Sequence, residues 1–270
     1  MYIVCASVCY RDFREDEIEA MIEDAGRAGY RAIELHGPKF WDVAAINAFE
    51  PEKMKKKLDA AGLKCTGIYP PGFGGKDGAD IEARAQAVAK ACAFAECLGC
   101  DFLDATGAER RVGDNRQVLD RVVMMLERIL ELTPNSKVKI GLENHYQNAF
   151  EQASDYDYVL ERVGHPRIGI NVDTGHFHSA GVDTVGLIRK YKDRIYGVHI
   201  KDHIGLQSVG IGRGEVDFPS VIGALKEIGY ARGLTVELEH ADKENTLHYV
   251  REALAYLSGL LGRKITGVAP

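Results

Sequence analysis

The sequence has no apolar run long enough to cross a membrane. Its longest hydrophobic stretches fall far short of the roughly 18 residues that a membrane helix needs. The opening MYIVCASVCYRDF has neither a basic segment nor a long hydrophobic segment, so we predict a first strand there and not a signal peptide. There is no polar low-complexity tract, and 46% hydrophobic residues suffice for a sizeable core. We therefore expect a folded cytoplasmic protein without a membrane segment.

Positive charge is also in short supply. The 34 basic and 40 acidic residues give a formal net charge of −6, whereas binding to DNA or RNA backbones needs an excess of cations. The one basic cluster, KMKKKLDAAG at residues 53–62, follows Pro51 with a helical pattern and is better explained as a solvent-facing helix surface. We predict no nucleic-acid partner.

Cysteines are few, and they form no recognisable metal-binding framework. Six in a chain of 270 residues, without a secretory signal, indicate reduced thiols in the cytoplasm. Cys97 and Cys100 form a single CxxC, but one such pair makes a poor zinc site. It also falls at the end of a predicted helix, where a redox pair would normally begin one. We interpret both cysteines as packing residues.

Eight short β-rich segments alternate along the chain with amphipathic stretches such as residues 80–98 and 115–132. This alternation predicts a parallel sheet, and eight units favour a closed barrel over an open sheet. We see no linker, since the longest loop-like stretch, residues 205–220, directly follows a strand. The prediction is an α/β fold, a single (β/α)8 TIM barrel over residues 1–270. The strand segments begin at residues 2, 31, 64, 100, 138, 167, 194 and 233.

Polar side chains end four consecutive strands of this predicted barrel. Glu143 ends the fifth strand, Asp173 the sixth and His199 the seventh. The eighth ends in VELEH, where Glu237 and Glu239 share a face, so alternation alone does not choose between them. We favour Glu237 because it comes earlier and therefore deeper. In such barrels the carboxyl ends of the strands carry the chemistry, so we expect these side chains to meet.

Three carboxylates and one imidazole form an oxygen-rich ligand set without thiolate. Such a set suits Mn²⁺, Mg²⁺ or Co²⁺ better than a closed Zn²⁺ site. Four protein ligands on an octahedral ion leave two positions for adjacent substrate oxygens, such as those of a hydroxy ketone. The ion would then act as a Lewis acid that stabilises an enediolate.

Other polar and aromatic residues lie near the same predicted mouth. Glu34 and His36 share a strand face, where a substrate contact and a buried structural pair are equally plausible. Trp41, the only tryptophan, follows in a loop and could cover the apolar face of a sugar, although packing explains it as well. Lys201 could orient a substrate oxygen or serve as a salt-bridge partner, and we favour the substrate role.

The motifs LENH, NVDTGH, VHIKD and TVELE, in this order, resemble the xylose isomerase-like TIM-barrel superfamily, which includes sugar phosphate isomerases and epimerases. The resemblance spans essentially the whole chain. By analogy with ketose 3-epimerases, it implies one ion and two glutamates, Glu143 and Glu237, that exchange protons on opposite faces of the inverted carbon. It also implies that His176 binds substrate oxygens, with Arg213 as the nearest match to an arginine of similar role. The implied metal ligands are Glu143, Asp173, His199 and Glu237.

The same resemblance separates this chain from endonuclease IV, the three-zinc nuclease of the superfamily. That enzyme needs histidines at the ends of the third and fourth strands, which here read IYPPG and LDATG. The D-x-H motif after its seventh strand is also missing.

We therefore expect a divalent-metal-dependent isomerase or epimerase acting on a free sugar or polyol ketone. A dehydratase or lyase with an inosose-like or dehydroshikimate-like substrate is the alternative, because elimination also begins with proton removal beside a carbonyl. A non-catalytic sugar-binding protein is a third hypothesis. By resemblance we expect a homo-oligomer, either a dimer or a tetramer.

Overall fold

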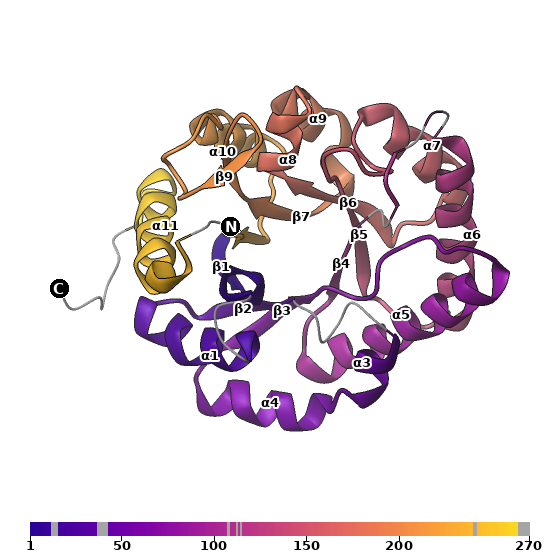
Figure 1. Cartoon of the computed structure of the whole chain (residues 1–270), viewed down its shortest axis with the longest axis horizontal. Coiled ribbons are helices and arrows are strands. Elements are labelled where there is room, and N and C mark those ends of the chain that lie inside the picture. Colours follow the sequence, from indigo (N-terminus) through magenta and orange to yellow (C-terminus); the bar gives the residue numbers. More distant parts are fainter. Residues whose placement is uncertain are drawn as a thin grey trace.

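A computed structural model describes residues 1–11, 16–36, 43–106, 109–111, 113, 115–239 and 242–263. Its centre is a closed barrel of eight parallel strands with helices around it (Figure 1). Each barrel strand pairs with the next along the chain, and the last closes against the first. The predicted (β/α)8 barrel is confirmed. Its strands are β1 (Tyr2–Ala6), β2 (Ala32–Leu35), β3 (Lys64–Ile68), β4 (Phe102–Thr106), β5 (Lys139–Glu143), β6 (Ile168–Asp173), β7 (Ile195–Ile200) and β10 (Gly233–Val236).

The helices pack apolar faces against the outside of this barrel. Long helices occupy both amphipathic stretches predicted from the sequence, where α5 and α6 lie. Among the described residues, no helix combines the length and apolar character needed to cross a membrane. The helices are α1 (Glu17–Ala28), α3 (Val43–Ala48), α4 (Pro51–Ala60), α5 (Gly78–Leu98), α6 (Arg116–Leu132), α7 (Ala153–Val163), α8 (Thr174–Ser179), α9 (Thr184–Tyr191), α10 (Phe218–Glu227) and α11 (Thr246–Leu260), with 3-10 turns at Ser7–Tyr10, Lys192–Arg194 and Lys243–Asn245.

Two details differ from the sequence prediction. The stretch after β7 contains a small antiparallel hairpin, β8 (Asp202–Ile204) with β9 (Gln207–Val209), in place of a plain loop. The last barrel strand ends at Val236, so Glu237 lies one residue beyond it. Asp202, the first residue of the hairpin, holds the loop that follows it. Its carboxylate accepts hydrogen bonds from the backbone amides of Gly212, Gly214 and Val216.

The barrel interior is polar near its carboxyl end, in contrast to the branched apolar layers usual in this fold. Glu34, Asp104, Asn171 and Thr235 are all buried there, with at most 3% of each exposed. A small residue on β3 makes room for them: a Cβ atom at Gly67 would lie 3.0 Å from the Glu34 side chain. These polar groups lie directly below the strand ends that carry the candidate site.

Candidate metal centre

Four adjacent strands bring Glu143, Asp173, His199 and Glu237 together. Glu143 and Asp173 are the last residues of β5 and β6, and His199 is the penultimate residue of β7. Register aligns two of them, since Asp173 pairs directly with His199 across the β6–β7 ladder. All four are buried, the most exposed being Glu237 at 6%. The structure therefore gathers the four ligand candidates named from the sequence.

The spacing of these side chains suits a cation. One ligand atom from each lies within 4.8 Å of all the others. Nδ1 of His199 lies 2.5 Å from Oε1 of Glu143 and 2.5 Å from Oε2 of Glu237. Within the described part of the chain, Nδ1 of His199, Oδ2 of Asp173 and Oε2 of Glu237 make ion-pair contacts but no hydrogen bond of regular geometry. Buried polar atoms are rarely left in this state, so the donor set fits a divalent ion.

Neighbouring backbone and side-chain groups hold Asp173 in place. Its Oδ1 accepts a hydrogen bond of 2.8 Å from the backbone N–H of His176, which caps helix α8. The Asn144 side chain accepts from the Asp173 amide and donates to its carbonyl. One carboxylate oxygen is thus tied to the helix, while the other faces the cluster.

Lys201 joins the two glutamates of the eighth strand to the site. Its ammonium is 1% exposed and lies 2.7 Å from Oε1 of Glu237, 2.8 Å from Oε2 of Glu239 and 3.3 Å from Oδ2 of Asp173. Glu239 lies farther out, is 30% exposed, and also pairs with Arg11. Of the two glutamates that the sequence left open, Glu237 is therefore the one inside the cluster.

Electrostatics set the two candidate proton-transfer carboxylates apart. Burial raises the pKa of Glu143 to about 7, while His199 opposes this shift and Glu237 adds to it. Burial also acts to raise the pKa of Glu237, but the charges of Lys201 and His199 outweigh it and hold that pKa well below its usual range. Burial likewise raises the pKa of Asp173.

A cavity of about 350 Å³ opens over these side chains. His176, buried beside it, packs against His145 with ring centroids 3.8 Å apart and ring planes tilted by 36°. Its Nε2 lies 3.1 Å from Nζ of Lys201. Burial and the charge of Lys201 lower the pKa of His176 well below its usual value, so the ring is neutral. The lining includes Arg11, His36, Tyr69, Arg84, Glu143, His145, Asn148, His176, Lys201, Glu237 and Glu239.

Two other residues singled out from the sequence, Arg213 and Glu34, do not line this cavity. The Arg213 side chain is half exposed, pairs with Glu252 and lies over the ring of Tyr249, so it does not line this cavity. Glu34 is buried below the cavity and contacts His199. Trp41 lies outside the described residues.

Some site residues carry no clear signal in the sequence. Asp104 and Asn171 lie within strands whose other residues are mostly apolar. A single polar residue in such a strand does not by itself indicate a functional site. Arg11 and Tyr69 reach the cavity only because the barrel closes. The one sequence signal for Asp104 and Asn171 is a polar side chain inside an apolar strand, in the segments CDFLDATG and RIGINVDTGH.

With the geometry in view, comparison with known proteins places the chain. A family model described as xylose isomerase-like TIM barrel matches residues 22–260. The chain belongs to this family. A Mesomycoplasma hyopneumoniae (strain 7448) inosose dehydratase is 23% identical over 274 residues, covering 89% of this chain and 87% of that protein. An inosose dehydratase from Clostridium tetani is 27% identical over 152 residues, and there the match covers 49% of this chain and 51% of the relative, about half its length.

Solved structures agree on the fold. The IOLI protein, whose structure contains a bound zinc atom, superposes with a TM-score of 0.80 at 17% identity and covers 97% of this chain and 98% of its own. A D-allulose 3-epimerase from Methylomonas sp., in complex with D-allulose, has a TM-score of 0.78 at 19% identity, covering 96% of both chains. Family members with this barrel thus include dehydratases and epimerases, and identities this low carry only the fold.

Proposed function

We propose that this family member is a divalent-metal-dependent enzyme that moves a proton on the carbon beside the carbonyl of a sugar or polyol ketone. The observation that carries the proposal is the pair of glutamates, Glu143 and Glu237, that converge on His199 from different strands at the floor of the cavity. Two carboxylates at one reacting carbon can serve as base and acid.

The ion would be held by Glu143, Asp173, His199 and Glu237, which offer three carboxylates and one imidazole. When bound, a divalent metal polarises a carbonyl as a Lewis acid and so acidifies the neighbouring C–H bond. The donor set favours Mn²⁺, Mg²⁺ or Co²⁺, although the related IOLI protein contains zinc. Because Oδ2 of Asp173 and Oε2 of Glu237 are buried without a regular hydrogen bond, binding such an ion would also offset the cost of their desolvation.

The chain's own residues would divide the remaining work. One glutamate removes the proton from the substrate carbon, and the other returns a proton from the opposite face. His176, neutral and beside the cavity, would accept or donate a hydrogen bond to a substrate hydroxyl. Lys201 keeps Glu237 ionised through their 2.7 Å ion pair and supplies positive charge where negative charge develops on substrate oxygens.

Return of the proton to the same carbon from the opposite face gives an epimer, whereas its return to the former carbonyl carbon gives an isomer. An isomerase or epimerase is our first assignment. The enzyme would be a homo-oligomer and would act in the cytoplasm. The cytoplasmic location is supported by the six cysteines, which are all free thiols, as in proteins of a reducing compartment.

Dehydration is the second candidate, favoured by the inosose dehydratases among the relatives. Here the same glutamate removes the proton, and a hydroxyl on the next carbon leaves as water instead of a proton returning. The ammonium of Lys201 lies 3.1 Å from Nε2 of the neutral His176 at the cavity edge, where the ammonium could protonate the departing hydroxyl and His176 could hydrogen-bond to it.

A panel of free ketoses and inososes, incubated with Mn²⁺-loaded protein and analysed by chromatography with mass detection, separates the two outcomes. An epimer has an unchanged mass, whereas dehydration removes the mass of one water. Glu143→Gln should lower the rate of either reaction by about 10²- to 10⁴-fold while leaving the circular dichroism spectrum unchanged. Turnover of Glu143→Gln at a rate close to wild type would refute the proposed proton transfer.

A further inference from the structure

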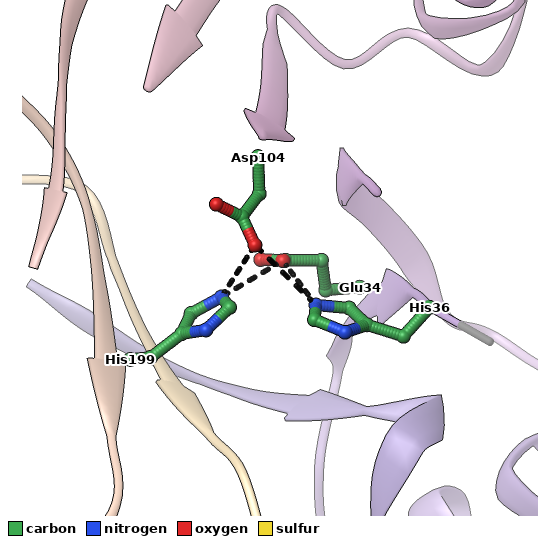
Figure 2. A group of neighbouring side chains, drawn as sticks. All are labelled: Glu34, His36, Asp104 and His199. Atoms are coloured by element: carbon green, nitrogen blue, oxygen red, sulfur yellow. Dashed lines mark hydrogen bonds and ion pairs between the residues drawn. The ribbon is translucent and has the colours of Figure 1, made fainter. Parts of the chain in front are cut away.

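Below the candidate metal centre, a second group of metal-capable side chains converges inside the barrel (Figure 2). Glu34 lies on β2, His36 directly after it, Asp104 on β4 and His199 on β7. All four are buried, none being more than 2% exposed. Figure 2 shows the carboxylates of Glu34 and Asp104 directed at the two imidazole rings, so that one polar atom of each residue faces a common centre.

Four of the six separations between these atoms are close to the edges of a small tetrahedron. Nε2 of His36 and Nε2 of His199 lie 2.8 and 3.0 Å from Oε1 of Glu34. Oδ2 of Asp104 lies 3.4 Å from Nε2 of His199 and 3.8 Å from Nε2 of His36. Ligands of a tetrahedral zinc, each about 2.0–2.1 Å from the metal, are about 3.3 Å from one another. The observed distances scatter around that value.

Surrounding residues hold each carboxylate by one oxygen and leave the other facing the centre. The Asn171 amide donates a hydrogen bond of 2.7 Å to Oδ1 of Asp104, and the Thr235 hydroxyl donates one of 2.9 Å to Oε2 of Glu34. Oδ2 of Asp104, which points into the group, has no hydrogen-bond partner among the residues that the structure describes. Metal ligands are commonly oriented in this way by a surrounding layer of hydrogen bonds.

His36 is fixed by its backbone. Its N–H donates to the hydroxyl of Ser7 at 2.7 Å, and that hydroxyl donates back to its carbonyl at 2.6 Å. The backbone that carries the ring is therefore held in place by a neighbouring segment. The substrate cavity borders this ring, since His36 is among its lining residues.

The charge inside this end of the barrel also calls for a second cation. Five carboxylates are buried in the two groups together, and Lys201 with one divalent ion brings three positive charges to them. A second cation would further offset the repulsion between these buried carboxylates. The five buried carboxylates are Glu34, Asp104, Glu143, Asp173 and Glu237.

We propose that Glu34, His36, Asp104 and His199 form a second metal site, of tetrahedral N2O2 type and suited to Zn²⁺, stacked below the first. Both ring nitrogens of His199 then serve as ligands, Nδ1 for the upper site and Nε2 for the lower one. The ring gives up its N–H proton to solvent when both sites fill, and so links the two ions. The lower ion lies away from the substrate cavity and fixes the orientation of His199.

The two sites share His199 but differ in their aspartates, which provides a matched test. Asp104→Asn and Asp173→Asn each keep the oxygen that accepts a hydrogen bond and alter the oxygen that faces the ions. Full-length wild type and both variants are stripped with chelator, reloaded with Zn²⁺, dialysed and analysed for metal per chain. We expect two ions in wild type and one in each variant. If Asp104→Asn does not fold by circular dichroism, His36→Gln replaces it in the comparison.

Cobalt distinguishes the two geometries, because tetrahedral Co²⁺ absorbs visible light far more strongly than octahedral Co²⁺. We expect an intense band in Co²⁺-loaded wild type and Asp173→Asn, and its loss in Asp104→Asn. One ion per chain in wild type, or an Asp104→Asn variant with wild-type metal content, would overturn the second site. Metal loss confined to Asp173→Asn would uphold the upper site of the proposed function and overturn the lower one; loss confined to Asp104→Asn would do the reverse.

Discussion

The ammonium of Lys201 lies 2.7 Å from Oε1 of Glu237, and this pair is almost completely enclosed by the barrel. Lys201 also contacts Asp173 and Glu239, so one cation supports three carboxylates around the candidate site. Lys201 should therefore stabilise the folded protein, and this contribution can be measured separately from activity.

Replacing Lys201 with Met should lower the free energy of unfolding of the metal-free protein by about 3–5 kcal/mol, because the variant leaves buried carboxylates without their partner. Urea denaturation after chelator treatment measures this loss. Arg213→Met is the control, since Arg213 pairs with Glu252 at the surface and its loss should change stability little. Equal stability of the two variants would contradict the role given to Lys201.

Metal binding should strengthen with pH. Burial raises the pKa of Glu143 to about 7 in the metal-free protein, and a carboxylate binds a cation only when ionised. Between pH 6 and pH 8 the ionised fraction of such a group rises about tenfold, so the apparent Mn²⁺ affinity should rise by about that factor. Calorimetric titration at both pH values tests this, and Glu143→Gln should bind more weakly with a flatter pH dependence.

The same pKa shift has a defined sign for stability. Since the folded-state pKa of Glu143 lies above its usual value, its contribution stabilises the metal-free protein below about pH 4.5 and is lost as the pH rises to about 7. Glu143→Gln should therefore stabilise the metal-free protein relative to wild type more at pH 8 than at pH 5. A difference that is constant with pH would contradict this assignment.

A side chain at Gly67 should lower the stability of the protein. A Cβ atom there would lie 3.0 Å from the Glu34 side chain, so Gly67→Ala should destabilise the protein by about 1–3 kcal/mol through overpacking. Gly26→Ala is the matched control, because a Cβ atom at that position in α1 meets nothing within 4 Å. It should stabilise the helix by about 0.5–1 kcal/mol. Thermal unfolding of both variants measures the contrast.

Substrate binding should depend on His176 and not on Arg213. His176 lines the cavity, whereas Arg213 lies outside it against Tyr249. Loss of one hydrogen bond to substrate costs about 0.5–1.5 kcal/mol, so His176→Ala should raise KM about 3- to 10-fold. Arg213→Ala should leave KM unchanged, and the reverse pattern would restore Arg213 as a substrate ligand.

The barrel and the convergence of four polar side chains could be predicted from the sequence because both depend on local order. Strands alternate with helices, and the carboxyl ends of consecutive parallel strands must meet, so Glu143, Asp173 and His199 could be placed without coordinates. The choice of Glu237 over Glu239 needed the position of Lys201, which only the closed barrel provides.

The lower group of side chains could not be predicted in the same way. Glu34 and Asp104 come from β2 and β4, which are not neighbours in the barrel, and their contacts with His199 cross its interior. Which interior residues lie at the same depth depends on strand tilt and register, including the irregularity between Ile33 and Glu34. Arg213 was expected at the cavity because it follows β7 in the sequence, but its side chain lies outside the cavity against Glu252 and Tyr249.

The most direct test of the central claim is exchange of the substrate proton with solvent. Mn²⁺-loaded protein is incubated in D2O with each ketose and inosose of the panel, and deuterium at the carbon beside the carbonyl is followed by NMR. We predict incorporation for the true substrate class with wild-type protein and none with Glu143→Gln or Glu237→Gln. Metal-loaded wild type that binds a ketone without exchanging its proton would contradict the account and leave a sugar-binding barrel in its place.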